Sequence, residues 1–192
     1  MTTPKQLWVL AGGNGAGKST FYNLYLAKYG IKFVNADLIA KDIDPVNPEA
    51  ASPQASTVAA KIREDLISQG ITFCLETVFS HESKIDFIGR AKANGYRIIL
   101  VYIHLFDSSL NEARVRQRID EGGHSVPTEK IHSRIPRTVN NVKTALSIVD
   151  EARILDNSYR EDPFQQIIVM KEEDYEVKTE PLPKWAKEFL PA

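Results

Sequence analysis

Short apolar runs alternate along the chain with segments in which apolar residues recur every three or four positions. The short runs are typical of buried strands, and the wider spacing is typical of helices that bury one face. The runs predict strands at residues 7–11, 31–36, 71–75, 96–104, 152–156 and 165–170. The wider spacing predicts helices at 21–29, at 38–43, before Gly70, after Ser80, at 108–121 and from Thr128 onward.

Strands that alternate with helices in this way favour an α/β fold with a mostly parallel, five- to six-stranded sheet and helices on both faces. The nearly continuous apolar run at 96–104 supports a sheet that is covered on both faces. In such folds, ligands bind at the carboxyl ends of the strands. We therefore expect the functional residues to follow the strands.

Length favours one domain that spans residues 1–192, because the chain is long enough for one sizeable core and short for two. A flexible connector between two charged helices predicts a helical lid at about 117–135. The tail, at about 172–192, is polar and then rich in proline. Its apolar residues are available to dock on the body, and they are Trp185, Phe189 and Leu190.

Three residues are expected to shape the later helices. Ser80 and Thr128 are predicted N-caps, because a hydroxyl at that position accepts a hydrogen bond from the first turn. Pro136 has no backbone N–H, so it should kink or split the helix that follows Thr128.

The net charge, the cysteine count and the length of the apolar runs indicate which partners and which compartment to expect. The formal net charge is -1, which does not favour a nucleic acid or an anionic membrane. The single cysteine, Cys74, cannot form an internal disulfide, and this favours a reducing compartment. No apolar run is long enough to span a membrane, and the segment before the first strand is too short and polar for a signal peptide. We therefore expect a cytoplasmic protein.

The strongest motif follows the first predicted strand and precedes the first predicted helix. Its spacing, G-x-x-x-x-G-K-S, is the P-loop (Walker A) pattern of the P-loop NTPase fold. The glycines let backbone N–H groups turn inward around phosphate, while Lys18 reaches the terminal phosphates and Ser19 holds Mg²⁺. An ordinary glycine-rich turn is the alternative. The predicted nucleotide-binding residues are Gly12, Gly13, Asn14, Gly15, Ala16, Gly17, Lys18, Ser19 and Thr20.

Carboxylates follow three of the predicted strands. Asp37 is the best candidate for orienting an acceptor hydroxyl, with an N-cap for the helix from Leu38 as the alternative. Glu76 follows a fully apolar strand, where a carboxylate needs a cation or a ligand. It is a candidate for the Mg²⁺ shell or for substrate binding, and a solvated position at the edge of the sheet is the alternative. Asp107 is better explained as a helix cap.

Five arginines flank the connector Gly122–Pro127. Arginines on a closing lid could neutralise charge on a transferring phosphoryl group, although a solvated face is the alternative for each one. We select Arg118 and Arg134, and among the histidines only His124 is a candidate. The five arginines are Arg114, Arg116, Arg118, Arg134 and Arg137.

Taken together, these motifs resemble the zeta toxin family of P-loop kinases, in particular its short, toxin-only branch. The resemblance covers positions from about 7 to 160. Its segments are Gly12–Thr20, Asn35–Ala40, Glu76–Ser80, Arg118–Pro127 and Asn140–Asn141.

The resemblance implies a kinase that uses ATP or GTP with Mg²⁺. The best-known members phosphorylate the 3′-hydroxyl of the amino sugar in UDP-N-acetylglucosamine, which blocks peptidoglycan synthesis. Lys18 and Ser19 would bind phosphate and Mg²⁺, and Asp37 would be the base for the sugar hydroxyl. Glu76 and Thr77 would line the substrate site. Arg118 would act on the γ-phosphate.

The sequence departs from the family in two places. Larger members carry an acidic substrate contact where this chain has Ala60. A second arginine expected near the lid has no clear match, with His124 closest by position and Arg134 closest by chemistry. Toxins of this family usually meet an inhibitory helical antitoxin. A different small metabolite or a polynucleotide end remains open as the acceptor, as does a nucleotide-dependent binding module.

Overall fold

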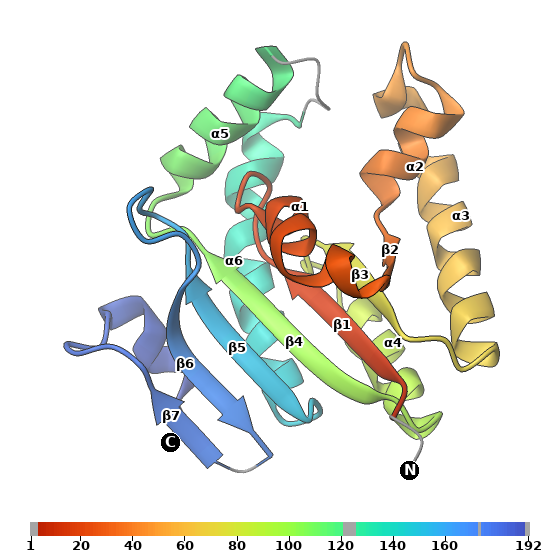
Figure 1. Cartoon of the computed structure of the whole chain (residues 1–192). Helices are drawn as coiled ribbons and strands as arrows, with labels where there is room; N and C mark the ends of the chain where they lie inside the picture. The colour runs from red at the N-terminus through yellow and green to blue at the C-terminus, as the bar shows by residue number, and fades with distance from the viewer. Residues whose placement is uncertain (1–3, 121–125, 173, 191–192) are drawn as a thin grey trace.

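The computed structural model describes residues 4–120, 126–172 and 174–190, which form a sheet with helices on both faces (Figure 1). The sheet has seven strands in the order β2-β3-β1-β4-β5-β6-β7. Strands β2, β3, β1, β4 and β5 pair in parallel, whereas β6 and β7 are antiparallel. The strands are β1 (Gln6–Ala11), β2 (Lys32–Val34), β3 (Phe73–Thr77), β4 (Arg97–His104), β5 (Glu151–Asp156), β6 (Gln165–Lys171) and β7 (Asp174–Val177).

The predicted α/β fold with a mostly parallel sheet is therefore confirmed, but the predicted number of five to six strands was too low. The additional strand, β7, is exposed throughout and lies in the polar segment that was assigned to the tail. Tyr175 and Val177 alternate with Asp174 and Glu176, but an alternation of only four residues inside a polar segment is a weak strand signal.

Helices cover both faces of the sheet. In Figure 1, α4 and α6 lie behind the sheet and α1 lies in front of it. The helical elements are α1 (Lys18–Phe21), η1 (Tyr22–Leu26), η2 (Ala27–Tyr29), α2 (Ala36–Ile43), α3 (Pro48–Ser68), α4 (Ser83–Ala93), α5 (Ser108–Asp120), α6 (Thr128–Leu146) and η3 (Lys184–Phe189). None of the helices in the described part of the chain has the length and apolar character needed to cross a membrane.

The central strands separate two apolar cores. Val9 of β1 pairs with Leu75 on one side and Leu100 on the other, and all three are buried in the larger core, together with residues of α3, α4 and α6. The opposite face buries Leu10 with Phe21, at the end of α1. Burial on both faces explains the nearly continuous apolar sequence of the central strands.

Several predicted boundaries were wrong for local reasons. Helix α4 begins at Ser83, so Ser80 is not its N-cap. The preceding turn instead holds Phe79 at φ 64, and the Thr77 hydroxyl accepts a hydrogen bond from the Phe79 N–H. Thr128 is the first residue of α6, not its cap. Pro136 lies inside α6, which continues as one helix.

The tail docks on the body through η3, as the sequence analysis predicted. Phe189 is buried, with its ring centroid 5.3 Å from that of Tyr102. Trp185 stacks on His104 at a centroid distance of 3.8 Å. The Tyr102 hydroxyl and His104 Nδ1 are 3.1 Å apart. The C-terminal aromatic residues therefore complete the core against β4.

Replacing Phe189 with alanine should lower the free energy of unfolding by about 3 kcal/mol, because it leaves a cavity beside Tyr102. Urea unfolding followed by tryptophan fluorescence would measure this loss. Lys187→Ala is the matched control, because Lys187 is exposed in the same element. Equal stability of the two variants would show that the tail contributes little to the fold.

His104 should make stability depend on pH. Burial lowers the pKa of His104 from 6.5 to about 4, although Asp156 and Glu188 oppose the shift. The unfolded chain then takes up a proton that the folded chain excludes, so stability should fall as pH decreases from about 6.5 towards 4, by about 1 kcal/mol per pH unit. His104→Gln should show a smaller loss than the wild type between pH 7.5 and pH 5 in urea unfolding. An identical loss in both proteins would contradict this origin.

Candidate active site

The P-loop connects β1 to a helical segment that runs from Lys18 through η1. The Ala16 N–H donates to the Gly13 carbonyl at 3.2 Å, and the Phe21 N–H donates to the Gly17 carbonyl at 2.9 Å. Gly15 and Gly17 have φ values of 78° and 98°, a region that favours glycine. The loop thus has the backbone conformation that the motif predicts.

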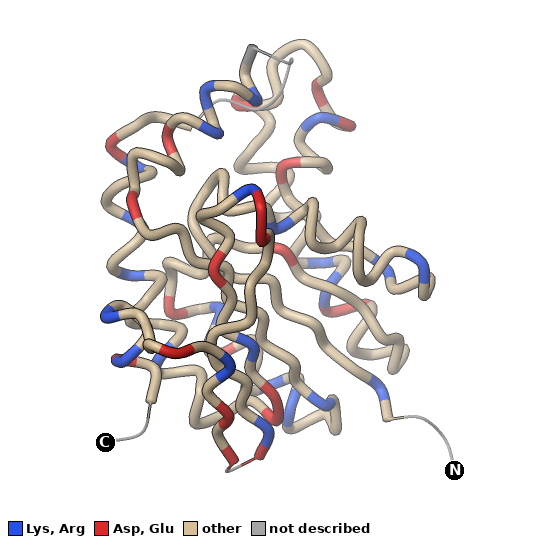
Figure 2. The backbone as a smooth tube through the Cα atoms, turned by 60° about the vertical axis from the view of Figure 1, so that its left-hand side comes forward, with Lys and Arg blue, Asp and Glu red and all other residues tan. Residues whose placement is uncertain are grey.

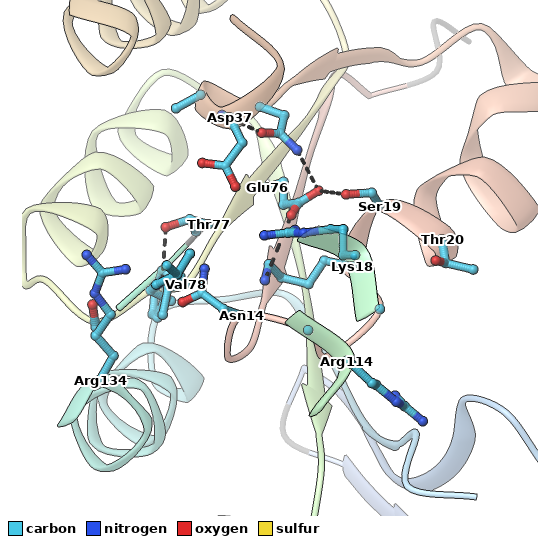
Figure 3. Close-up of a pocket in the computed structure, with 18 of the residues that line it drawn as sticks. Asn14, Lys18, Ser19, Thr20, Asp37, Glu76, Thr77, Val78, Arg114 and Arg134 are labelled. Carbon is cyan, nitrogen blue, oxygen red and sulfur yellow. Dashed lines mark hydrogen bonds and ion pairs between the residues drawn. The ribbon is translucent and has the colours of Figure 1, made fainter. Parts of the chain in front are cut away.

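Lys18 is folded onto the loop that precedes it. Its Nζ donates to the carbonyls of Gly12 and Gly13, at 3.0 and 2.9 Å. It also lies 3.8 Å from Glu76 Oε1. Figure 3 shows Lys18 and Glu76 pointing toward one another across the site. The ammonium group is therefore held at the mouth of the phosphate-binding loop.

The carboxylate of Glu76 joins three segments of the chain. Its Oε2 accepts hydrogen bonds from Ser19 Oγ at 2.6 Å and from Asn35 Nδ2 at 2.9 Å. Its side chain is only 12% exposed, so these two donors and Lys18 offset the cost of burying the charge. A hydroxyl beside a carboxylate also supplies the hard oxygen ligands that Mg²⁺ prefers, so this pair of residues fits the metal.

The position of Glu76 differs from the expected one. It lies inside β3, paired with Leu10 of β1, and not beyond the strand end. A charge after an apolar run normally indicates that the strand has ended. Here the partners of Glu76 come from other segments, which the local sequence does not reveal.

Asp37 lies in the first turn of α2, whereas β2 already ends at Val34. The N-cap of this helix is Asn35, whose Oδ1 accepts hydrogen bonds from the Asp37 and Leu38 N–H groups at 2.7 and 3.3 Å. The alternative of Asp37 as N-cap is therefore wrong. Its carboxylate lines the cleft described below and remains available for another role.

The electrostatics of Lys18 place the predicted site residues near one another. Burial lowers the pKa of Lys18, Glu76 and Asp37 act to raise it, and the charge of Arg118 acts to lower it further. A buried cation whose pKa stays lowered despite two carboxylates gains from additional negative charge. A bound triphosphate would supply that charge.

A cleft of about 1200 Å³ lies around these residues. Its walls come from the P-loop, α2, α3, the segment that follows β3, the segment that follows β5, and helices α5 and α6. The predicted site residues that line it are Asn14, Gly15, Gly17, Lys18, Ser19, Thr20, Asp37, Glu76, Thr77, Arg118 and Arg134. The remaining residues of the loop, Gly12, Gly13 and Ala16, are buried.

The five arginines divide into two groups. Arg114, Arg118 and Arg134 line the cleft. Arg116 pairs with Glu112 at 2.7 Å, and the exposed Arg137 donates to the Ser133 carbonyl. Neither of these two lines the cleft. The other lid candidate, His124, lies outside the described residues.

Two asparagine side chains support the P-loop. Asn111 of α5 donates through Nδ2 to the Asn14 carbonyl at 2.7 Å, and Asn157 donates to the Ala16 carbonyl at 2.9 Å. Arg114 in turn donates to the Asn157 carbonyl at 2.9 Å. Asn157 directly follows β5, which is where the sequence places residues near a bound nucleotide, whereas sequence reasoning missed Asn111. Asn111 has no such signal.

Four further cations line the cleft without having been predicted. Their helices or loops were placed correctly, but a sequence does not say which helix face meets a cleft. They are Arg63, Lys84, Lys130 and Arg160.

Known proteins resemble this chain in sequence and in fold. A family model described as Zeta toxin matches residues 2–166. An uncharacterized protein of Haemophilus influenzae is 33% identical over 137 residues, which cover 68% of this chain and 97% of the relative.

Two solved structures share the fold at low identity. A chain in the crystal structure of AvrRxo1-ORF1:-ORF2 with ATP gives a TM-score of 0.74 at 18% identity, and the match covers 91% of this chain but only 61% of that one. A chain of the PezAT chromosomal toxin–antitoxin system of Streptococcus pneumoniae gives a TM-score of 0.67 at 16% identity, covering 88% and 72% of the two chains. Since the family model also matches most of its length, this protein belongs to the zeta toxin family.

Proposed function

We propose that this chain is a kinase that transfers the γ-phosphate of ATP or GTP to a hydroxyl of a small acceptor, with UDP-N-acetylglucosamine as the first candidate. The observation that carries the proposal is the convergence of Lys18, Ser19, Glu76 and Asp37 on one cleft behind a P-loop. A phosphate-binding cation, a metal-binding pair and a separate carboxylate are the parts that phosphoryl transfer requires.

The nucleotide binds with its phosphates in the loop, where backbone N–H groups and Lys18 surround them. Phosphate oxygens replace the Gly12 and Gly13 carbonyls as partners of the Lys18 ammonium group. Ser19 and Glu76 would hold Mg²⁺, and a metal ion bound there would supply positive charge to the phosphates. Asn35 keeps the Glu76 carboxylate in place, since its amide donates to Oε2.

Asp37 orients the acceptor. Its carboxylate takes the proton of the attacking hydroxyl, the acceptor oxygen forms a bond to the γ-phosphorus, and the bond from that phosphorus to the β–γ bridging oxygen breaks. The nucleoside diphosphate leaves. Thr77 lines the same cleft as Asp37 and contacts the acceptor, while Arg118 and Arg134 neutralise the transferring group.

The structural neighbours support the choice of nucleotide and a partner. One of them was solved with ATP, and the other belongs to a toxin–antitoxin system. We therefore favour ATP as the donor and an inhibitory antitoxin as a protein partner. Lys, Arg, Asp and Glu are interspersed along the backbone in Figure 2, which favours a small acceptor over a polynucleotide.

Replacing Asp37 with alanine should lower the transfer rate at least about 100-fold while leaving nucleotide affinity within about twofold. The assay incubates the protein with Mg-ATP and UDP-N-acetylglucosamine and follows the gain of one phosphate by mass spectrometry. Asp42→Ala is the matched control, because Asp42 is exposed on the same helix. Unchanged transfer in Asp37→Ala would contradict the assigned base. No gain in the wild type would contradict the acceptor.

Gly17→Ala should abolish nucleotide binding. An added Cβ would lie 2.5 Å from Asn157 Nδ2 and 3.3 Å from the Phe164 ring, at a φ of 98°. The loop must then shift away from the conformation that surrounds phosphate. Gly30→Ala is the control, because its φ of 67° is also positive but its Cβ meets nothing within 4 Å. Calorimetric titration with Mg-ATP should show binding to Gly30→Ala only, and normal binding to Gly17→Ala would refute the role of this loop.

A further inference from the structure

Two cations lie together on the wall of the cleft formed by α3 and the start of α4. Arg63 projects from α3, and Lys84 is the second residue of α4. Both line the cleft, together with Ala59 of α3 and with the segment from Thr77 to His81 that follows Glu76. Tyr159 and Phe164, which follow β5, line another part of the same cleft.

Neither cation has an anionic partner among the described residues. Arg63 packs its guanidinium over the Phe87 ring at 5.1 Å, and its Nε is buried without a hydrogen-bond partner. Among the described residues, none forms a hydrogen bond or ion pair with the Lys84 side chain, whereas the Lys84 N–H donates to the His81 carbonyl at 3.1 Å. Glu64 acts to raise the pKa of Arg63, but its carboxylate pairs with Arg90 at 2.7 Å.

The charge of Arg63 acts on Lys84. Burial lowers the pKa of Lys84, and the charge of Arg63 lowers it further. Burial also lowers the pKa of Arg63, with Arg90 adding to the effect and Glu64 opposing it. Two partly desolvated like charges without an acid between them are unfavourable in the absence of a ligand. An anion bound between them would remove that cost.

We propose that Arg63 and Lys84 form a subsite for an oxyanion group, a phosphate or a carboxylate, carried by the acceptor. The inference rests on the proposed function, because it assigns the subsite to the acceptor side of the same cleft. The P-loop and Lys18 already provide for the phosphates of the donor, so these two cations serve a different negative group. The guanidinium can form paired hydrogen bonds with such a group, and the ammonium adds a point charge.

This subsite determines which acceptor molecules bind in the cleft. An acceptor must place a hydroxyl at Asp37 and an oxyanion at Arg63 and Lys84 in the same binding mode. A diphosphate linked to a sugar meets both requirements, whereas a neutral sugar leaves the two cations without a partner. The chain therefore selects a charged metabolite over an uncharged carbohydrate.

The test measures anion binding without turnover. The full chain is first saturated with Mg²⁺ and a non-hydrolysable ATP analogue, which occupies the P-loop, and is then titrated with pyrophosphate in a calorimeter. A second titration with succinate tests a carboxylate in place of a phosphate. The wild type should bind one of the two probes, and Arg63→Gln and Lys84→Gln should each weaken that binding roughly tenfold or more.

Two control variants separate the subsite from unspecific charge and from misfolding. Lys61→Gln removes an exposed charge from the same helix, outside the cleft lining, and should bind the probe as the wild type does. Arg63→Lys keeps the charge and should retain part of the binding. Thermal unfolding checks that each variant is folded, and affinity for the ATP analogue should stay within about twofold.

The outcomes distinguish this inference from the proposed function. The subsite is contradicted if the wild type binds neither probe. It is also contradicted if the wild type and both glutamine variants bind a probe equally well. Probe binding that depends on Arg63 and Lys84 supports the subsite even if UDP-N-acetylglucosamine gains no phosphate, a result that would contradict only the named acceptor. Transfer to UDP-N-acetylglucosamine with an unchanged KM in both glutamine variants would contradict the subsite and leave the kinase standing.

Discussion

The hydrogen bonds and the ion pair of one buried carboxylate hold the site together. Glu76 would be costly in β3 if it had no partners, and its partners come from two other segments of the chain. Ser19 belongs to the P-loop helix, Lys18 lies beside it, and Asn35 precedes α2. The carboxylate therefore fixes the phosphate-binding loop, the central strand and the first turn of α2 relative to one another.

Asn35 extends this dependence toward the acceptor side. Its amide nitrogen donates to Glu76 while its amide oxygen accepts from the Asp37 and Leu38 N–H groups. One side chain thus caps α2 and orients the carboxylate that accompanies the phosphates. Asp37, the proposed base, therefore lies on a helix turn that hydrogen bonds connect to Glu76 and the P-loop. Phosphoryl transfer requires this kind of preorganisation.

Sequence patterns were sufficient where the determining forces are local. The P-loop, the central strands and the position of the tail follow from glycine spacing, apolar runs and aromatic residues. Sequence patterns were insufficient where the contacts of a residue come from distant parts of the chain. Asn35 and Asp37 are both preferred N-caps, and only the reach of Asn35 to Glu76 separates them. Glu76 was expected beyond β3 because the pattern does not contain its partners. The faces of α3 and α4 that carry Arg63 and Lys84 depend on tertiary packing in the same way.

The distribution of charge along the cleft limits what its ligand can be. On the donor side, Lys18 is balanced by Glu76 and stays close to Asp37, so that side can exist before the nucleotide arrives. On the proposed acceptor side, the side chains of Arg63 and Lys84 form no ion pair within the part of the chain that the structure describes, and Glu64, which acts on Arg63, is paired with Arg90. The proposed donor and acceptor sides therefore favour different ligands. The donor side gains from a ligand that brings both phosphate and a metal ion, whereas the acceptor side gains from a ligand whose charge is negative and compact. A kinase with this arrangement would recognise its acceptor partly by a group that takes no part in the reaction, and the free energy of that contact would help to hold the hydroxyl at Asp37.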